Sequence, residues 1–450
     1  MKKFMVLALA LVLVGCSNES DDEKDGGNQE NGGNQENGGK IQNLAMSSNL
    51  LSLTSAANQV TGASDNAEII RVIPDTNEAV LISSKARTIA KYSYDEKDGL
   101  KREAASDAIA AKNDDDEMTS GTLLDKDTIL VTHTILGKTG DKITSCEGEL
   151  VALSLSEAEF GSEVARIAVG PMPDAVSISP NGKWAITADE RDSAATWGKC
   201  PVESAVPSVT LVDLSEGAAK MKAVARISFA GKSEYGPREP EYVAIASDND
   251  TVAVTLQDSN EVAIFSISEV MKQSASESGL IELNEDATKI TMLPVSDEGL
   301  YTWPDGVLSI DVKGSTYFVA AGEWNDTIVT LNKAGEIVST VIVRETEVPS
   351  SYPCMSDASS PLYSPDSLAS FVRDGVTYVA ASLRYAGAVI ALDFTDPTKP
   401  TFAGIAKVGE KDATTCSDSA SSVRPEGISA TSSLIWTANE KESSVSVVKF

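Results

Sequence analysis

The sequence predicts an all-β fold, a seven-bladed β-propeller whose blades are mostly four-stranded and antiparallel. The main observation is a unit of about 60 residues that recurs along the chain. Each clear unit opens on proline and an acidic residue and continues through short apolar strands separated by tight turns. Helical periodicity does not extend over any long stretch of the sequence. Repeats of this size, which bury their faces against their neighbours, are typical of propellers.

Five units are clear, because each opens on proline followed by an acid and these acids lie 60 to 67 residues apart. The acids are Asp174, Glu241, Asp305, Asp366 and Glu426. Glycine-containing turns such as Asn181-Gly182 and Asp374-Gly375 follow the first strand, as expected for hairpins in which glycine adopts a positive φ. The spacing and the turns together indicate one blade per unit.

Two more blades are predicted upstream, although neither opens on proline and an acid. They cover residues 67 to about 106 and residues 123 to about 170. The last unit ends at Phe450 after only three strands. We therefore expect a strand within residues 49–53 to supply the fourth, because closing the ring removes an open sheet edge.

The chain begins with two lysines and an unbroken apolar run of 11 residues, 4–14. This run is too short for a membrane-spanning helix, which needs roughly 20 residues, and it suits a secretory signal. It ends in Leu13-Val14-Gly15-Cys16, which resembles the lipobox of bacterial lipoproteins. The resemblance implies a signal peptide at residues 1–15 and acylation of Cys16. The alternative is an ordinary signal peptide with a cysteine at its end by chance.

Residues 16–40 are rich in Gly, Asn, Gln and Glu and contain the hexad NQENGG twice. Such a composition supplies no core and predicts a flexible acidic tether between the lipid and a propeller domain at residues 41–450. Ser17 follows the lipobox cysteine, which in lipoproteins favours the outer membrane. We therefore expect the protein to be anchored there by Cys16, either facing the periplasm or exposed at the cell surface.

The formal charge of −30 constrains the class of partner. A strongly acidic surface repels nucleic acid, which needs a basic face. It suits cations, basic proteins or neutral glycans, and no nucleic-acid partner is expected.

Four cysteines follow Cys16, and an even number in an exported chain favours disulfides. Cys146 and Cys200 fall in neighbouring units, and Cys354 and Cys416 fall at equivalent places in two others. We therefore expect the pairs Cys146–Cys200 and Cys354–Cys416. The single histidine, His133, excludes a site with several histidine ligands.

Several segments resemble known families of secreted propellers. Residues 173–183 and 240–265 are similar to YVTN and lactonase-like bacterial propellers. Residues 304–323, PDGVLSIDVKGSTYFVAAGE, and 425–440, with Trp436-Thr-Ala-Asn-Glu440, resemble more closely the choice-of-anchor propellers, some of which are labelled alkaline-phosphatase-like. The resemblance covers roughly residues 65–450. It implies the fold more strongly than any chemistry, because such families mix enzymes and binding proteins.

The predicted topology gathers unusual residues at one end of the channel. The inner strand of each blade starts at that end, so the five acids should surround its mouth. Loops at the same end carry three tryptophans. The expected binding residues are Asp174, Glu241, Asp305, Asp366, Glu426, Trp197, Trp303 and Trp324.

Five carboxylates around one channel repel one another unless they are paired or bind a cation. Their oxygens would suit Ca²⁺ or Mg²⁺, so the same five acids are candidate metal ligands. The alternative is structural: each acid caps a neighbouring backbone or pairs with Arg238, Arg384 or Arg424, and the tryptophans pack internally.

The leading hypothesis is a non-catalytic, lipid-anchored extracytoplasmic propeller that binds a protein, glycan or cation on this face. The alternative is a Ca²⁺- or Mg²⁺-assisted hydrolase of the lactonase or phosphatase-like kind, with His133 as a weak candidate for a general base. A redox role is a third reading that no cofactor motif supports. Convergence of three or more of these five acids within metal-ligand reach, without an arginine that neutralises them, would favour the hydrolase. Bonding of each of the five to a blade backbone or an arginine would favour binding.

Overall fold

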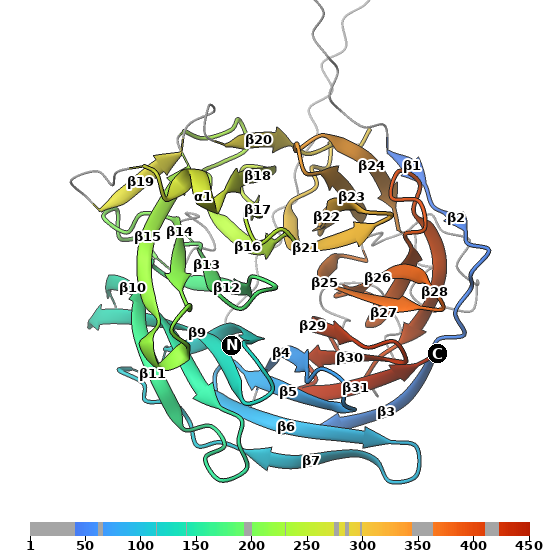
Figure 1. Cartoon of the computed structure of the whole chain (residues 1–450), viewed down its shortest axis with the longest axis horizontal. Coiled ribbons are helices and arrows are strands. Elements are labelled where there is room, and N and C mark those ends of the chain that lie inside the picture. Colours follow the sequence, from blue (N-terminus) through green and yellow to red (C-terminus); the bar gives the residue numbers. More distant parts are fainter. Residues whose placement is uncertain are drawn as a thin grey trace, which may run out of the picture. The chain divides into compact units, whose positions relative to one another are not determined.

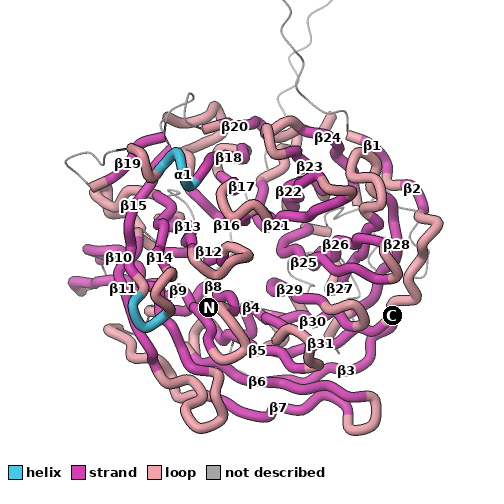
Figure 2. The backbone as a smooth tube through the Cα atoms, viewed as in Figure 1, coloured by secondary structure: helices cyan, strands magenta, loops and turns pink. Residues whose placement is uncertain are grey.

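Seven antiparallel sheets surround a central axis in the computed structural model of this chain, which confirms the predicted seven-bladed propeller (Figure 1). The structure describes residues 41–61, 66–113, 115–140, 142–192, 200–229, 231–273, 279–283, 288–297, 299–343, 363–409 and 423–450. Nearly all regular structure in these residues is strand (Figure 2), apart from the short helix α1, Ile267–Val270, and a 3-10 turn at Ala218–Lys220.

Each blade has four antiparallel strands, ordered from the channel outwards. Blade 1 contains β4 (Ala67–Val72), β5 (Glu78–Ser83), β6 (Thr88–Asp95) and β7 (Gly99–Ala105); blade 2 contains β8 (Glu117–Leu123), β9 (Thr128–Thr139), β10 (Lys142–Ser154) and β11 (Glu163–Val169). Blade 3 contains β12 (Pro173–Ile178), β13 (Trp184–Asp189), β14 (Ser208–Asp213) and β15 (Lys222–Phe229); blade 4 contains β16 (Pro240–Ile245), β17 (Thr251–Leu256), β18 (Glu261–Ser266) and β20 (Lys289–Met292). Blade 5 contains β21 (Pro304–Val312), β22 (Ser315–Gly322), β23 (Thr327–Asn332) and β24 (Ile337–Ile342); blade 6 contains β25 (Pro365–Arg373), β26 (Val376–Leu383), β27 (Ala388–Asp393) and β28 (Thr401–Lys407). Blade 7 contains β29 (Pro425–Ala430), β30 (Leu434–Asn439), β31 (Ser444–Lys449) and β3 (Thr54–Val60).

The ring is closed by a strand from the start of the domain, as expected, but this strand lies further along the chain than residues 49–53. Strand β3 pairs with β31, so that Thr54 lies opposite Lys449 and Val60 opposite Ser444. The preceding residues are used in blade 6 instead. Asn49 donates a hydrogen bond to Asp393 Oδ2 at 2.8 Å, and the Leu51 N–H donates to the Ala403 carbonyl at 2.8 Å.

Short parallel strands extend three of the blades at their outer edges. These additions are β1 (Gln42–Asn43) on β24, β2 (Ala45–Met46) on β28, and β19 (Leu280–Leu283) on β15. The blades are therefore mostly, but not uniformly, four-stranded, in agreement with the prediction.

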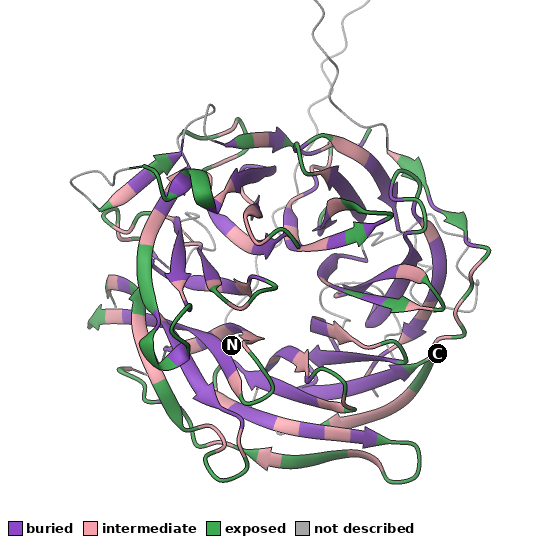
Figure 3. Cartoon of the chain, viewed as in Figure 1, coloured by how far each residue is buried: buried purple, intermediate pink, exposed green. Residues whose placement is uncertain are grey.

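Apolar side chains fill all seven interfaces between neighbouring blades, including the one between blades 7 and 1. Strand β5 shows how the sequence achieves this: Leu81 packs towards blade 7, whereas Val80 and Ile82 pack towards blade 2. Because successive side chains point to opposite faces of a strand, a strand buried on both faces is a continuous apolar run. The middle strands are accordingly buried, and exposure is concentrated at outer edges and turns (Figure 3).

Blade 2 differs from the prediction at its start. Its inner strand begins at Glu117 rather than at Leu123. This start is not evident in the sequence, because Met118 stands where blades 3 to 7 have proline. Met118 pairs with His133 as Pro173 pairs with Asp189. No helix within the described residues is both long and apolar enough to cross a membrane.

Candidate ligand site in the central channel

The inner strand of every blade carries one extra residue near its start. In blade 3, Pro173 pairs with Asp189 and Ala175 pairs with Ala188, so Asp174 has no cross-strand partner. Equivalent register shifts occur in the other six inner strands. Such β-bulges redirect a side chain out of the sheet pattern. The predicted acids Asp174, Glu241, Asp305, Asp366 and Glu426 all lie in these bulges, with Glu68 in blade 1 and Thr119 in blade 2.

Hydroxyl groups from the second strands hold the bulges in place. Thr255 Oγ1 accepts a hydrogen bond from the Tyr242 N–H at 2.9 Å and donates one to the Asp305 carbonyl at 2.7 Å in the next blade. Ser382 does the same between blades 6 and 7, and its hydroxyl lies 3.2 Å from the Glu426 carbonyl. The bulged acids are therefore fixed relative to one another across the blade interfaces.

A second layer of charged residues follows the second strands. Glu190, Glu323, Arg384 and Glu440 each come directly after such a strand. Their backbone N–H groups donate to the residue just before the inner strand, for example Glu440 to the Arg424 carbonyl at 2.9 Å. The sequence reasoning did not include Glu190, Glu323 or Glu440 in the site. Their common position one residue past the second strand is the signal that could have identified them.

Two groups of three carboxylates converge in the channel. Asp174, Glu190 and Glu241 join blades 3 and 4, and in this group one oxygen from each residue lies within 4.8 Å of the others. The second group, Asp305, Glu323 and Asp366, joins blades 5 and 6 with the same spacing. Each group therefore combines predicted bulge acids with one acid of the second layer.

Arginines accompany the acids of blades 5 to 7. Arg384 forms ion pairs with Glu323, with Asp366 at 3.2 Å and with Glu426 at 2.9 Å. Arg424 lies 3.5 Å from Glu426 and 3.2 Å from Glu440. Neither outcome that the sequence left open is met in full. Each converging group contains only two of the five predicted acids, and Arg384 and Arg424 form ion pairs with acids in blades 5 to 7.

Burial raises the pKa of five channel acids well above their ordinary values, and the neighbouring carboxylates raise it further. These residues are Glu68, Glu241, Asp305, Asp366 and Glu426. Arg384 opposes the rise in pKa at Asp305, Asp366 and Glu426. The Oε2 atom of Glu241 is buried and has no hydrogen-bond partner among the described residues. The channel mouth therefore favours protonation or the arrival of a cation.

The channel is bridged below the acids. Arg71 of β4 donates a hydrogen bond to the Tyr242 hydroxyl of β16 at 3.0 Å, and to the Gly121 carbonyl at 2.8 Å. Blades 1 and 4 lie on opposite sides of the ring (Figure 1). This hydrogen bond therefore links two blades across the channel.

Aromatic rings lie beside the second carboxylate group. Trp303 precedes Pro304-Asp305, Trp324 follows Glu323, and their rings stack with centroids 4.4 Å apart. Tyr301 stacks on both, at 5.4 and 5.9 Å. The structure thus brings two of the three predicted tryptophans together next to the acids, whereas Trp197 lies outside the described residues.

The sequence of the chain matches a known protein family. Residues 68–358 match the sequence profile of the choice-of-anchor I domain. The chain belongs to the choice-of-anchor I family. Membership confirms the resemblance to choice-of-anchor propellers and indicates a secreted or cell-surface propeller.

Solved structures with the same architecture are distant in sequence from this choice-of-anchor I protein. Virginiamycin B lyase from Staphylococcus aureus superposes with a TM-score of 0.52 and 12% identity, covering 89% of this chain and 99% of the lyase. Hydrazine synthase from Kuenenia stuttgartiensis gives 0.52 and 12%, covering 87% and 97%. At such identity the likeness shows the fold alone. No curated protein matches the chain in sequence.

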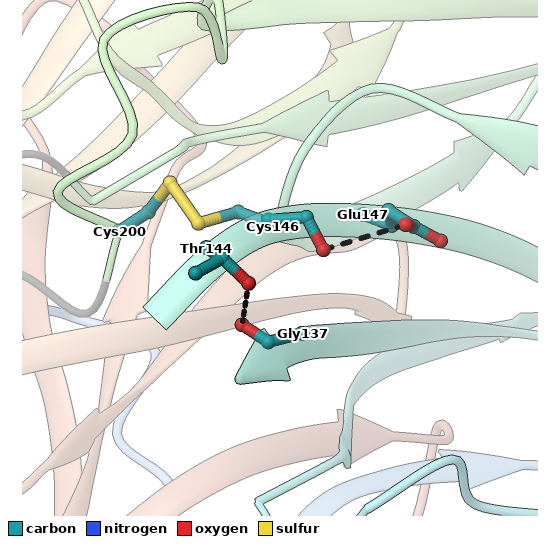
Figure 4. Close-up of a disulfide and its surroundings, with 6 residues drawn as sticks. Gly137, Thr144, Cys146, Glu147 and Cys200 are labelled. Atoms are coloured by element: carbon teal, nitrogen blue, oxygen red, sulfur yellow. Dashed lines mark hydrogen bonds between the residues drawn. A yellow bond between two sulfur atoms is a disulfide. The ribbon is translucent and has the colours of Figure 1, made fainter. Parts of the chain in front are cut away.

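The choice-of-anchor I propeller contains the expected disulfide between Cys146 and Cys200 (Figure 4). The bond joins β10 to the segment before β14, and both sulfurs lie in a small buried cluster with Leu136 and Met172. It therefore fastens blade 2 to blade 3 beside the channel mouth. Cys354 and Cys416 lie outside the described residues.

His133 lies inside blade 2 with no exposed surface. Its Nδ1 is 3.2 Å from Glu149 Oε2, which also pairs with Arg166. Burial lowers the pKa of His133 against the opposing effect of Glu149. Because β10, which carries Glu149, lies further from the channel than β9, this interaction orients the imidazole away from the acidic mouth.

Proposed function

We propose that this choice-of-anchor I protein is a lipid-anchored extracytoplasmic binding propeller that takes a divalent cation, Ca²⁺ or Mg²⁺, at the mouth of its channel. The observation that carries the proposal is the group Asp174, Glu190 and Glu241, whose oxygens lie within 4.8 Å of one another. Two oxygens that both bind Ca²⁺ at 2.3–2.6 Å are at most about 5 Å apart, so this spacing suits a shared ion.

Electrostatics favours this group over the second one. Three ionised carboxylates at this spacing repel one another. A hard cation between them attracts each one and so offsets the repulsion. In the second group the guanidinium of Arg384 already supplies positive charge to Glu323 and Asp366. The buried Glu241 Oε2 that accepts no hydrogen bond among the described residues is an oxygen that a cation would satisfy.

Isothermal titration calorimetry of the mature chain with CaCl₂ and MgCl₂ at pH 7.5, after treatment with chelator, tests the site. Saturable binding of one ion per chain is expected, with loss of at least tenfold in affinity in Glu241→Gln. Glu68→Gln is the matched control, because Glu68 occupies the same bulge in blade 1 and belongs to neither carboxylate group. The assignment would be refuted if neither ion bound, or if Glu241→Gln bound the ion with the same affinity as the wild type.

The lipid anchor is the second part of the proposal and rests on the lipobox at Leu13–Cys16. Three acyl chains on Cys16 would hold the protein on the membrane effectively permanently, since even two suffice for stable anchoring. In detergent phase separation the wild type should enter the detergent phase and Cys16→Ser the aqueous phase. Equal partition of the two would show that the cysteine is not acylated.

A cation-assisted hydrolase of the lactonase or phosphatase-like kind is a second candidate. It is favoured by the raised pKa of Asp366 and Glu426, to which burial contributes most, because a carboxyl group with a raised pKa is better suited to act as a general acid. Esterase, lactonase and phosphatase assays with and without chelator test it. Chelator-sensitive turnover that is lost in Glu241→Ala and Asp305→Ala would support it, and turnover indifferent to both would exclude it.

A further inference from the structure

Four aromatic side chains form a continuous cluster on the loops of blades 4 and 5. Tyr235 contacts Tyr301 at 5.2 Å between ring centroids, Tyr301 stacks on Trp303, and Trp303 stacks on Trp324 at 4.4 Å with planes 19° apart. We call Tyr235, Tyr301, Trp303 and Trp324 the aromatic cluster. None of its rings belongs to the apolar clusters described between the blades. It therefore lies outside the buried apolar packing between the blades.

The outer rings of the cluster face solvent. Trp324 is 42% exposed and Tyr235 is 37% exposed, among the most exposed large apolar side chains described. Trp303 covers one face of Trp324. Grouped aromatic surface of this kind on a soluble protein marks a contact site, whereas single exposed apolar residues need no explanation.

The cluster is held rigidly before any ligand arrives. The Trp303 N–H donates to Asn260 Oδ1 at 3.0 Å, and the Trp324 N–H donates to the Thr302 carbonyl at 3.3 Å. Thr302 in turn donates to the Pro294 carbonyl at 2.8 Å. Trp303 also adopts φ 51°, a conformation that a bulky residue takes only when its surroundings impose it. Such preorganisation lowers the entropic cost of binding.

Acidic residues lie close to the cluster along the chain. Trp303 is two residues before Asp305, and Trp324 directly follows Glu323, which pairs with Arg384. Asp258 is close enough to Tyr301 to add to the effect of burial in raising the pKa of that phenol. The nearby Arg238 is held by Glu261 through two bonds of 2.8 and 3.1 Å. Aromatic faces beside carboxylates attract organic cations, through the ring quadrupole and through charge.

We infer that the aromatic cluster is a binding site for a small alkylammonium compound, with the cationic group against the exposed surface of Trp324 and attracted by Asp258, the acid that acts on Tyr301. A neutral sugar would use the stacked rings but would gain nothing from the negative charge. This site lies on blades 4 and 5 and does not depend on the cation site at Asp174, Glu190 and Glu241.

The test is a titration of the mature chain with choline, followed by tryptophan fluorescence and calorimetry in the presence of chelator, which keeps divalent ions out of the comparison. The neutral isostere 3,3-dimethyl-1-butanol, maltotriose and a lysine-rich peptide are titrated in parallel. We expect saturable binding of choline, at least tenfold weaker binding of the isostere, and no binding of maltotriose.

Substitution locates the site. Cation–π contacts are worth roughly 0.5–2 kcal/mol, so Trp324→Ala should weaken choline binding by about 2- to 30-fold while Trp324→Phe keeps part of it. Trp184→Phe is the matched control, because Trp184 starts β13 and packs against the cluster between blades 3 and 4. Four results would overturn the inference: equal binding of the isostere, binding of maltotriose or of the peptide alone, no saturable binding of choline, or unchanged affinity in a folded Trp324→Ala.

Discussion

Asp189 allows the electrostatic reasoning to be tested with one substitution. It ends β13 with no exposed surface and accepts hydrogen bonds from Thr187 at 2.6 Å, Thr210 at 2.6 Å and Ser208 at 3.0 Å. Burial nevertheless raises the pKa of Asp189 from 3.8 to about 6, against the effect of these hydroxyls. We predict that Asp189→Asn removes a pH-dependent part of the stability.

The magnitude follows from linkage. A rise in pKa from 3.8 to about 6 corresponds to about 3 kcal/mol between the fully protonated and fully ionised limits. Because the folded pKa is higher than the unfolded one, this stability is complete below the unfolded pKa and is lost as pH rises through about 6. Between pH 4 and pH 7 the wild type should therefore lose about 2–3 kcal/mol that the variant does not lose.

Blade 7 supplies the control for this experiment. Asn439 occupies the equivalent place, accepts from Thr437 at 3.0 Å and donates to Ser444 and Ser446 at 2.9 and 2.8 Å. The surrounding hydroxyl groups therefore accommodate asparagine at this position. Asn439→Asp should introduce the pH-dependent stability that Asp189→Asn removes. Urea unfolding at pH 4, 5, 6 and 7 measures both. A wild-type-minus-variant free energy that stays constant over this range would refute the reasoning.

Two further substitutions and one deletion test the ion pairs, the disulfide and the closure of the ring. Arg384→Gln should cost about 3–5 kcal/mol at pH 8, because it leaves Glu323, Asp366 and Glu426 without their shared cation, and less at lower pH, because burial raises the pKa of Asp366 and Glu426 and so favours their neutral forms; equal losses of thermal stability at pH 8 and pH 5 would contradict this. Removal of residues 41–61 should abolish the cooperative thermal transition seen by circular dichroism, because β31 loses its partner β3; an unchanged melting curve would count against closure by β3. Cys146→Ser should lower the free energy of unfolding by about 4 kcal/mol, since the bond closes a loop with a sequence separation of 54 residues; reduction of the wild type should give the same loss, and a value near zero would argue against it.

Much of the fold could be predicted because one local pattern is repeated. Proline at the start of an inner strand and an acid after it recur in five blades, a glycine turn follows in blades 3, 5 and 6, and each feature has a local cause. The errors lie where that pattern is missing. Blade 2 has Met118 and Thr119 at these positions, and the closing strand β3 carries polar residues such as Asn58 and Gln59, so neither has a distinctive local signal.

The site was predictable only in part, because its grouping depends on contacts between blades. The bulge acids could be read from the repeat, and they do surround the channel. That Glu190 joins Asp174 and Glu241, or that Arg384 reaches three acids, depends on how far each second strand runs before the chain turns. The spacing of residues in the sequence does not reveal the length of each second strand. The residues that follow the second strands could nevertheless have been compared from blade to blade.

The distribution of charge around the ring connects the two proposed sites. In blades 5 to 7, Arg384 and Arg424 form ion pairs with the channel acids Glu323, Asp366, Glu426 and Glu440. On this side of the mouth, the positive charges of the two arginines therefore offset the negative charges of the acids. On the other side, Asp174, Glu190 and Glu241 converge, and the carboxyl oxygen of Glu241 is buried without a hydrogen-bond partner in the described structure. We therefore propose blades 3 and 4 for a bare ion, and blades 4 and 5, with the exposed rings of the aromatic cluster, for a cation that carries apolar groups.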